Sequence, residues 1–242
     1  MRRRHLLRGA LALSLPATGC LGTDTGTDAY RVGETATVEG VGEVTVTDIG
    51  VQRSVANDYL GLDVYEPATG QVVVVEFDER PNGTEPTPLA PRLDGERVAE
   101  PMDIGLYGYQ PRGAVAVPVR DVARAAVVLT RGTEPAWALP DEQVAKLGSA
   151  AEFRLRSAAF DHESASLTLT VANDGDRAGT FRGGVDYGDD YTNPFSVPVE
   201  AGREVTETVP LSPPWEPERD REFDVTADTR VIGWEYDPAD RQ

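Results

Sequence analysis

The sequence predicts an all-β protein: two tandem antiparallel β-sandwiches that follow a signal peptide and a flexible tether. Three observations predict this fold class. Apolar residues alternate with polar ones at a period of two along most of the chain after residue 30, as they do in half-buried strands. Glycine and proline separate the strand candidates at regular intervals. Only one segment has the features of a helix, and the roughly 210 residues after the tether suffice for two domains of about 100 residues each.

An export signal is predicted at the start of the chain. Arg3 and Arg4 precede one variable residue, two leucines and Arg8, and this spacing resembles the twin-arginine export motif. The apolar run over 9–17 is shorter than the roughly 20 residues that a membrane-spanning helix needs, so it is typical of a signal that is removed. We therefore predict a signal peptide over 1–19 and export of the chain in a folded state.

Cys20 is the only cysteine of the chain and follows small residues at the expected cleavage point. The segment 17–20 resembles a lipobox, whose cysteine receives a lipid and becomes the mature N-terminus, although Ala17 stands where leucine is more frequent. The alternative is cleavage by an ordinary signal peptidase, in which the thiol of Cys20 has no role. Residues 20–29 are rich in Gly, Thr and Asp and are predicted to form a lipid-anchored flexible tether.

The chain carries a formal net charge of −18 and a single lysine, Lys146. Residues 1–19 hold four arginines and no acid, so their removal leaves a charge near −22. Carboxylate-rich domains repel nucleic acids and anionic lipid headgroups, and we expect neither as a partner. Strong acidity with almost no lysine resembles the proteome bias of extreme halophiles, especially haloarchaea, at whose molar salt the repulsion is screened. The alternative is an acidic protein from a mesophilic organism whose genome has a high GC content.

The first sandwich is predicted over 30–139. Alternating apolar residues indicate strands at 30–38 and 44–51, and a last strand is indicated at 125–130. The continuous valine run 72–75 indicates a central strand that is covered on both faces.

Two further segments of this sandwich carry turn and edge signals. The segment 92–98 predicts a hairpin with an Asp-Gly turn at 94–95. The strand candidate at 114–119 contains Pro118, which cannot donate a ladder hydrogen bond, so we expect this strand at a sheet edge.

A linker with one short helix is predicted over 140–150, and the second sandwich over 151–242. Pro140 and two acids open the helical segment, and Gly148 follows its end. The second sandwich has strand candidates at 153–156, 167–171, 195–199 and 223–225, a turn at 173–175, and closing aromatics at Trp234 and Tyr236.

Both sandwiches resemble known extracellular modules. The first is similar to immunoglobulin-like domains of the DUF4352 type, through the stretches 30–35, 71–76, 93–95 and 111–115. The second resembles CARDB and fibronectin-type adhesion modules, through the stretches 167–175, 179–181 and 199–202. The resemblance implies surface modules with this fold, and it brings no catalytic residues.

We expect no enzymatic activity, because the chain offers few groups for it. His162 is the only imidazole after the predicted cleavage point. A Ser/His/Asp triad needs histidine as proton carrier, and His162 with Ser164 supplies the residue types without a nucleophile elbow or a glycine-rich oxyanion segment. One imidazole and a lipidated thiol cannot fill a zinc coordination sphere. We interpret His162 as part of an exposed loop.

The best candidate for a ligand is an acidic segment near residue 188. Asp186, Asp189 and Asp190 surround a glycine and supply the hard oxygen donors that calcium prefers. Their spacing differs from the EF-hand loop, which requires a bidentate glutamate at its twelfth position. A solvated acidic loop is the alternative, because Asp clusters arise freely in a chain this acidic.

Asn82 begins the tripeptide Asn-Gly-Thr, which fits the acceptor pattern for N-glycosylation. Proline and glycine surround it, so we expect it in a loop. On an exported protein this loop is accessible for modification, although such tripeptides also occur by chance.

Together these features predict an exported, lipid-anchored protein on the outer face of the cytoplasmic membrane. We expect a non-enzymatic interaction or envelope module, held to the membrane by its N-terminal lipid, that presents its loops to a protein partner at the cell surface. The alternative is a calcium- or ligand-binding accessory lipoprotein of a transporter or sensor. No other cofactor is expected.

Overall fold

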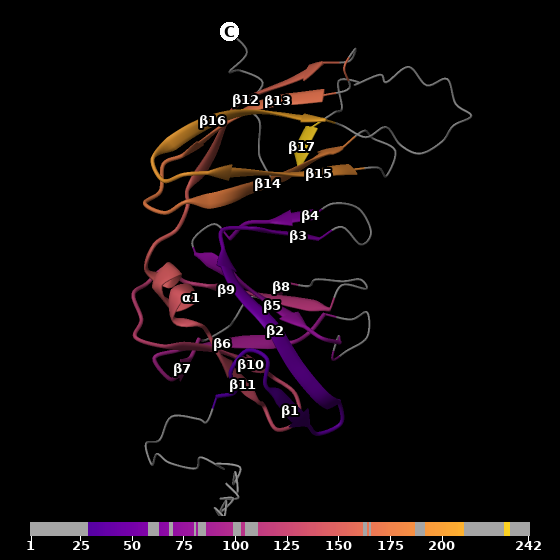
Figure 1. Ribbon diagram of the computed structural model, residues 1–242, viewed down its shortest axis with the longest axis vertical. Helices are drawn as coiled ribbons and strands as arrows, with labels where there is room; N and C mark the ends of the chain where they lie inside the picture. Colours follow the sequence, from indigo (N-terminus) through magenta and orange to yellow (C-terminus); the bar gives the residue numbers. More distant parts are fainter. Residues whose placement is uncertain are drawn as a thin grey trace, which may run out of the picture.

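The computed structural model confirms the predicted all-β fold class. Antiparallel strands form two sandwiches of two sheets each, with a short helix between them. In Figure 1 the sheets are stacked along the long axis, and the hairpin β3–β4 lies between the two sandwiches. The structure describes residues 29–57, 63–67, 70–79, 81, 86–98, 103–104, 111–161, 164, 166–186, 192–210 and 230–232.

The N-terminal sandwich consists of a five-stranded and a four-stranded sheet. The strand order is β1-β2-β5-β9-β8 in the first sheet and β11-β10-β6-β7 in the second. Their facing sides are mainly aliphatic and enclose the indole of Trp137. The strands of this half are β1 (Thr35–Val38), β2 (Gly42–Gln52), β3 (Val55–Asn57), β4 (Asp63–Tyr65), β5 (Gln71–Phe77), β6 (Leu89–Leu93), β7 (Glu96–Arg97), β8 (Asp103–Ile104), β9 (Arg112–Val117), β10 (Ala125–Leu129) and β11 (Ala136–Ala138).

Strand β5 lies in the middle of the five-stranded sheet and is covered on both faces, as its valine run predicts. Val73 and Val75 belong to the main core between the two sheets. Val72 and Val74 pack with Val55 of β3 in a smaller cluster on the opposite face. The hairpin β3–β4 therefore covers the outer face of this sheet and explains why the run is continuous.

Strand β9 contradicts the expectation of an edge strand at 114–119. It pairs with β5 on one side and with β8 on the other. Pro118 follows the last strand residue, Val117, so its missing N–H removes no ladder hydrogen bond. The edge prediction is wrong because the proline ends the strand instead of lying within it.

The chain enters the fold at Tyr30, beside strand β11. The backbone N–H of Tyr30 donates to the Ala136 carbonyl at 2.8 Å, and the N–H of Ala138 donates to the Tyr30 carbonyl at 2.8 Å. The ring of Tyr30 packs on Trp137, with 5.7 Å between the ring centroids. The strand predicted over 30–38 is therefore interrupted, because Tyr30 forms an isolated bridge and regular pairing begins at β1.

A short helical linker follows the N-terminal sandwich where the sequence predicts a helix. Helix α1 (Asp141–Ala145) continues into the 3-10 helix η1 (Lys146–Gly148). Pro140 precedes the first turn, and two acids in that turn interact favourably with the positive end of the helix dipole. Leu147 is buried in the main core of the N-terminal sandwich, so the linker is packed against it.

The C-terminal sandwich has two three-stranded sheets, with the orders β12-β13-β16 and β15-β14-β17. Three phenylalanines form the centre of its core. The ring of Phe181 contacts Phe153 edge-on at 5.9 Å and stacks on Phe195 at 6.0 Å. The strands are β12 (Phe153–Asp161), β13 (Ser166–Asn173), β14 (Gly179–Asp186), β15 (Thr192–Val199), β16 (Arg203–Pro210) and β17 (Arg230–Ile232).

The predicted strands of this half are confirmed where the structure describes them. The candidates at 153–156, 167–171 and 195–199 fall within β12, β13 and β15. The candidate at 223–225 and the aromatics Trp234 and Tyr236 lie outside the described residues. No helix in the described part of the chain is long and apolar enough to cross a membrane.

Candidate functional site

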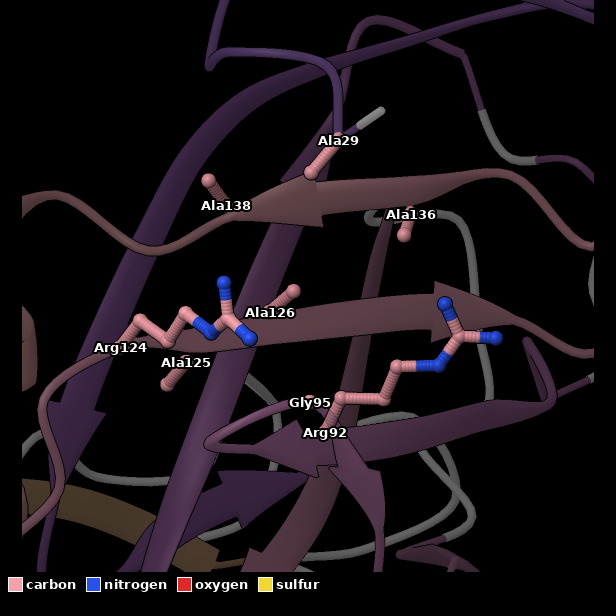
Figure 2. A pocket seen from close by; sticks show the side chains of 8 residues that line it. All are labelled: Ala29, Arg92, Gly95, Arg124, Ala125, Ala126, Ala136 and Ala138. Carbon is pink, nitrogen blue, oxygen red and sulfur yellow. The ribbon is translucent and has the colours of Figure 1, made fainter. Parts of the chain in front are cut away.

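A shallow depression lies on the outer face of the four-stranded sheet, near the point where the chain enters the fold. Its volume is about 110 Å³. Figure 2 shows Arg92 and Arg124 extended along this face, with small side chains around and between them. We call it the arginine depression; it is lined by Ala29, Arg92, Gly95, Arg124, Ala125, Ala126, Ala136 and Ala138.

Strand register explains why small residues lie beside Arg92. Arg92 of β6 lies opposite Ala126 of β10, which lies opposite Ala138 of β11. On its other side Arg92 lies opposite Arg97 of β7. Directly opposite residues in antiparallel strands share a face of the sheet. The alanine methyl groups are short, so this face carries little bulk beside Arg92.

The Asp-Gly turn predicted at 94–95 positions Arg124. Asp94 and Gly95 adopt φ values of 54° and 88°, which suits a tight hairpin turn. The Asp94 carboxylate accepts hydrogen bonds from the backbone N–H groups of Ala123 at 2.8 Å and Arg124 at 3.2 Å. A β-carbon at Gly95 would stand 3.3 Å from Nη2 of Arg124. The glycine thus allows both the turn and the close approach of the guanidinium.

The depression is basic on the surface of an acidic protein. Arg124 is exposed, and within the described residues its side chain forms no hydrogen bond or ion pair. The neighbouring Arg97 pairs with Glu134 at 3.4 Å, and both side chains are 45% exposed. Such an exposed pair is weak, because water and salt screen it. The site can therefore receive a carboxylate or another small anion.

A second cluster of polar groups joins the two sandwiches, and we call it the joint. The guanidinium of Arg177 donates to the Lys146 carbonyl of η1 and to Oε1 of Gln71 in β5, both at 2.6 Å. The fully buried Gln71 donates through Nε2 to the carbonyls of Lys146 at 3.0 Å and Leu147 at 3.2 Å. One arginine of the C-terminal sandwich is thus bonded to both the linker and the N-terminal sandwich.

Asn173 holds the turn that presents Arg177. Its side chain is 1% exposed. Its Oδ1 accepts from the N–H groups of Glu152 and Gly175, each at 3.0 Å. Its Nδ2 donates to the carbonyls of Arg177 at 2.8 Å and Val199 at 3.1 Å. Because every polar atom of the amide is used, the position of the turn is closely defined.

The hairpin β3–β4 provides a second contact with the C-terminal sandwich. It contacts β14, and Nη1 of Arg182 on that strand donates to the Ser54 carbonyl at 3.4 Å. Burial lowers the pKa of the Arg182 guanidinium, and the nearby positive charge of Arg112 lowers it further. Arg112 itself donates to the Ala56 carbonyl at 2.8 Å. Figure 1 shows this hairpin as the layer between the two sandwiches.

An ion pair lies at the base of the same hairpin. Nη2 of Arg53 lies 2.7 Å from Oε1 of Glu66, and Nη1 of Arg53 donates to the carbonyls of Pro67 and Gly70. Burial raises the pKa of the Glu66 carboxyl, and the charge and hydrogen bond of Arg53 oppose this shift. The hairpin is therefore fixed to β5 at the end where Gln71 begins the strand.

The structure describes only part of the predicted site residues. Asp186 ends β14, where its backbone pairs with Thr192 and Arg230. No group of three or more His, Cys, Asp or Glu that could hold a metal occurs among the described residues. The remaining predicted site residues lie outside the described residues; they are Arg3, Arg4, Cys20, Asn82, His162, Asp189 and Asp190.

Ser164 is the described member of the pair considered for hydrolysis. Its hydroxyl is hydrogen-bonded to that of Ser166 at 2.8 Å, and its N–H donates to the Asp161 carboxylate at 3.3 Å. These bonds belong to the exposed turn between β12 and β13.

The joint is absent from the sequence predictions, and only weak signals of it exist there. Gln71 is a polar residue directly before a buried valine run, and Asn173 opens a predicted turn. Either feature is compatible with an exposed strand end. Gln71 and Arg177 are 106 residues apart, so no local pattern connects them.

No family model matches the chain, and searches among curated proteins and among solved structures find no match. The fold itself defines the class: an all-β protein of two stacked sandwiches.

Proposed function

We propose that this chain is an exported, lipid-anchored protein of the cell surface that acts as a non-enzymatic interaction or envelope module. In this role the two sandwiches form a spacer between the membrane and a partner. The joint is the observation that carries the proposal, because it bonds the C-terminal sandwich to the linker and to β5 at once. Two sandwiches joined in this way can hold a distant surface at a defined position.

The outermost sheet supplies a surface suited to such a partner. It lies at the end of the stack opposite the point where the chain enters the fold (Figure 1). Its outer side carries exposed threonine pairs, with Thr168 bonded to Thr208 and Thr170 bonded to Thr206, each at 2.9 Å. Hydroxyl and methyl groups form an uncharged patch on a chain of net charge −18, which lowers the electrostatic cost of contact with another acidic surface.

The proposed anchor rests on the sequence around Cys20 and is tested by cell fractionation. Cys20→Ser should be exported and released into the medium, because no lipid can be attached. Arg3→Lys combined with Arg4→Lys should remain in the cytosol with an unprocessed N-terminus. Thr23→Ser, a conservative change just after the junction, is the matched control and should stay with the membrane fraction.

Two results would contradict the proposal. The first is membrane association of Cys20→Ser at the level of the unaltered chain. The second is an intact signal segment, detected by mass spectrometry, on the unaltered protein in the cytosol.

A further inference from the structure

We propose that the outer face of the sheet β12-β13-β16 binds the same face of a second copy of this chain. This sheet forms the end of the stack that lies opposite the entry point of the chain (Figure 1). Two copies joined face to face there carry their entry points at opposite ends of the pair. With the lipid anchor of the proposed function, the pair connects two facing membranes. That consequence rests on the proposed function, whereas the pairing itself does not.

Strand register shows which side chains share this outer face. Alternate residues of β13 belong to the core, so those between them lie on the outer side, each with a partner on β12 and one on β16. One row of three has charges at both ends: Arg154, Ala172 and Glu204. The next two rows are uncharged; they are Ser157, Thr170 and Thr206, and then Ala159, Thr168 and Thr208.

The two uncharged rows allow a second sheet to approach. All of their side chains are short, and the threonine hydroxyls are hydrogen-bonded to one another in pairs at 2.9 Å. Sheets that pack face to face lie about 10 Å apart, and short side chains permit this distance. Because each chain carries a net charge of −18, contact between two copies is least opposed where the surface has no carboxylates.

The charged row becomes self-complementary about a two-fold axis along β13. Such an axis exchanges the edge strands, so β12 of one copy faces β16 of the other, and Arg154 of each copy faces Glu204 of its partner. Both side chains are accessible, because Arg154 is 66% exposed and Glu204 is 58% exposed. Arg154 already bonds Asp174 at 2.8 Å, but a guanidinium has five N–H donors and can bond a second carboxylate.

The edges of this sheet are less suited than its face to contact with another chain. Strand β12 has a bulge between Leu155 and Ser157, which interrupts regular pairing. Strand β16 ends at Pro210, and its exposed Glu207 lies opposite the fully buried Leu169, on the side of the sheet that faces the core. Bulges, prolines and inward charges at an edge all oppose the addition of a further strand. Association through the face is therefore favoured.

The size of the face predicts a weak, reversible pair. Three strands of eight or nine residues cover roughly 14 Å by 27 Å, or about 380 Å² per copy. Stable interfaces bury about 800 Å² per partner, so a single pair should dissociate readily. Many copies on two facing membranes bind together, however, and their combined strength far exceeds that of one pair.

The test couples the full-length, unlipidated chain to phosphatidylcholine vesicles through Cys20, the only cysteine, by means of a maleimide lipid. Chemical coupling replaces the proposed anchor, so the result is independent of export and lipidation. Aggregation of the vesicles is followed by light scattering in about 0.5 M salt, where a Debye length of about 4 Å screens the long-range repulsion between acidic chains. We expect vesicles that carry the unaltered chain to aggregate.

An exchange of charges across the proposed axis tests the geometry. Arg154→Glu and Glu204→Arg should each lower the aggregation rate about tenfold, because two ion pairs become two contacts between like charges. Vesicles with Arg154→Glu mixed with vesicles with Glu204→Arg should aggregate again, because every mixed pair regains two contacts between opposite charges. The matched controls are Arg97→Glu and Glu43→Arg, which make the same changes at exposed positions of the N-terminal sandwich. They should leave the rate unchanged.

Two results would overturn the proposal. The first is that vesicles with the unaltered chain stay dispersed, because the face then has another occupant or none. The second is that the mixture of the two variants aggregates no faster than either variant alone. Both results leave the proposed function intact, since the fractionation of Cys20→Ser tests that function separately.

Discussion

Arg177 at the joint and Arg124 in the arginine depression carry the same guanidinium group in different surroundings. Arg177 is partly buried, and its two terminal nitrogens donate to fixed acceptors from the linker and from β5. Arg124 is exposed above small residues, and its backbone alone is held, by the Asp94 carboxylate. Where the fold provides fixed acceptors, as it does for Arg177, the guanidinium helps to hold the structure together. Where it provides none, as for Arg124, the guanidinium remains able to bind an anion.

The largest expected effect concerns the turn behind Arg177. Asn173→Ala removes four hydrogen bonds and leaves buried backbone groups without partners. We expect the free energy of unfolding to fall by about 3 kcal/mol, measured by chemical denaturation. Asn173→Asp keeps the two accepted bonds and should show a smaller loss. Equal stability of Asn173→Ala and the unaltered chain would show that the turn is not held in this way.

The next effect tests the joint itself. Arg177→Lys places one ammonium where a planar guanidinium bonds two acceptors, and we expect a loss of about 1–2 kcal/mol in the free energy of unfolding. Arg154→Lys is the control, because Arg154 is 66% exposed and pairs with Asp174 on the surface. A loss at Arg154 as large as that at Arg177 would remove the distinction between the two sites.

Gly95 tests how the depression is built. Gly95→Ala places a side chain at φ 88° and 3.3 Å from Arg124 Nη2. We expect a loss of about 1 kcal/mol in the free energy of unfolding, measured by thermal denaturation. Gly33→Ala is a matched control, because Gly33 has the same φ of 88° and open space around it. A loss at Gly95 no larger than at Gly33 would show that contact with Arg124 adds nothing.

The smallest effect is a pH dependence at the hairpin between the sandwiches. Burial raises the pKa of Glu66, so above pH 4.5 the folded state binds its proton more tightly than the unfolded state. The contribution of Glu66 to stability should therefore be greatest at low pH and decline as pH rises through the raised pKa. Denaturation of the unaltered chain and of Glu66→Gln between pH 5 and 7 measures it. A difference between them that grows in favour of the unaltered chain as pH rises would contradict the sign.

Much of the fold follows from local patterns in the sequence. The valine run in β5 predicts a strand covered on both faces, and the Asp-Gly pair at 94–95 predicts the turn between β6 and β7. Both succeed because periodicity and turn chemistry act within a few residues. The edge position predicted for 114–119 is wrong because a single proline is also a local signal. It cannot show which strands pair on either side of the strand that it follows.

The candidate sites are less accessible to sequence analysis. Arg92 and Arg124 come from different strands, and their common depression depends on the register that places Ala126 between β6 and β11. The joint depends on Gln71 and Arg177, which the fold brings together from opposite halves of the chain. Their neighbours in the sequence contain only weak signals of these contacts, and none that links one residue to the other.

Residual dipolar couplings of the full-length chain test most directly whether the joint makes the two sandwiches a single body. Couplings from the described strands β1–β11 and β12–β17 should fit one common alignment tensor. Arg177→Ala should require a separate tensor for each sandwich. Two different tensors for the unaltered chain would contradict a fixed joint, and with it the proposed spacer.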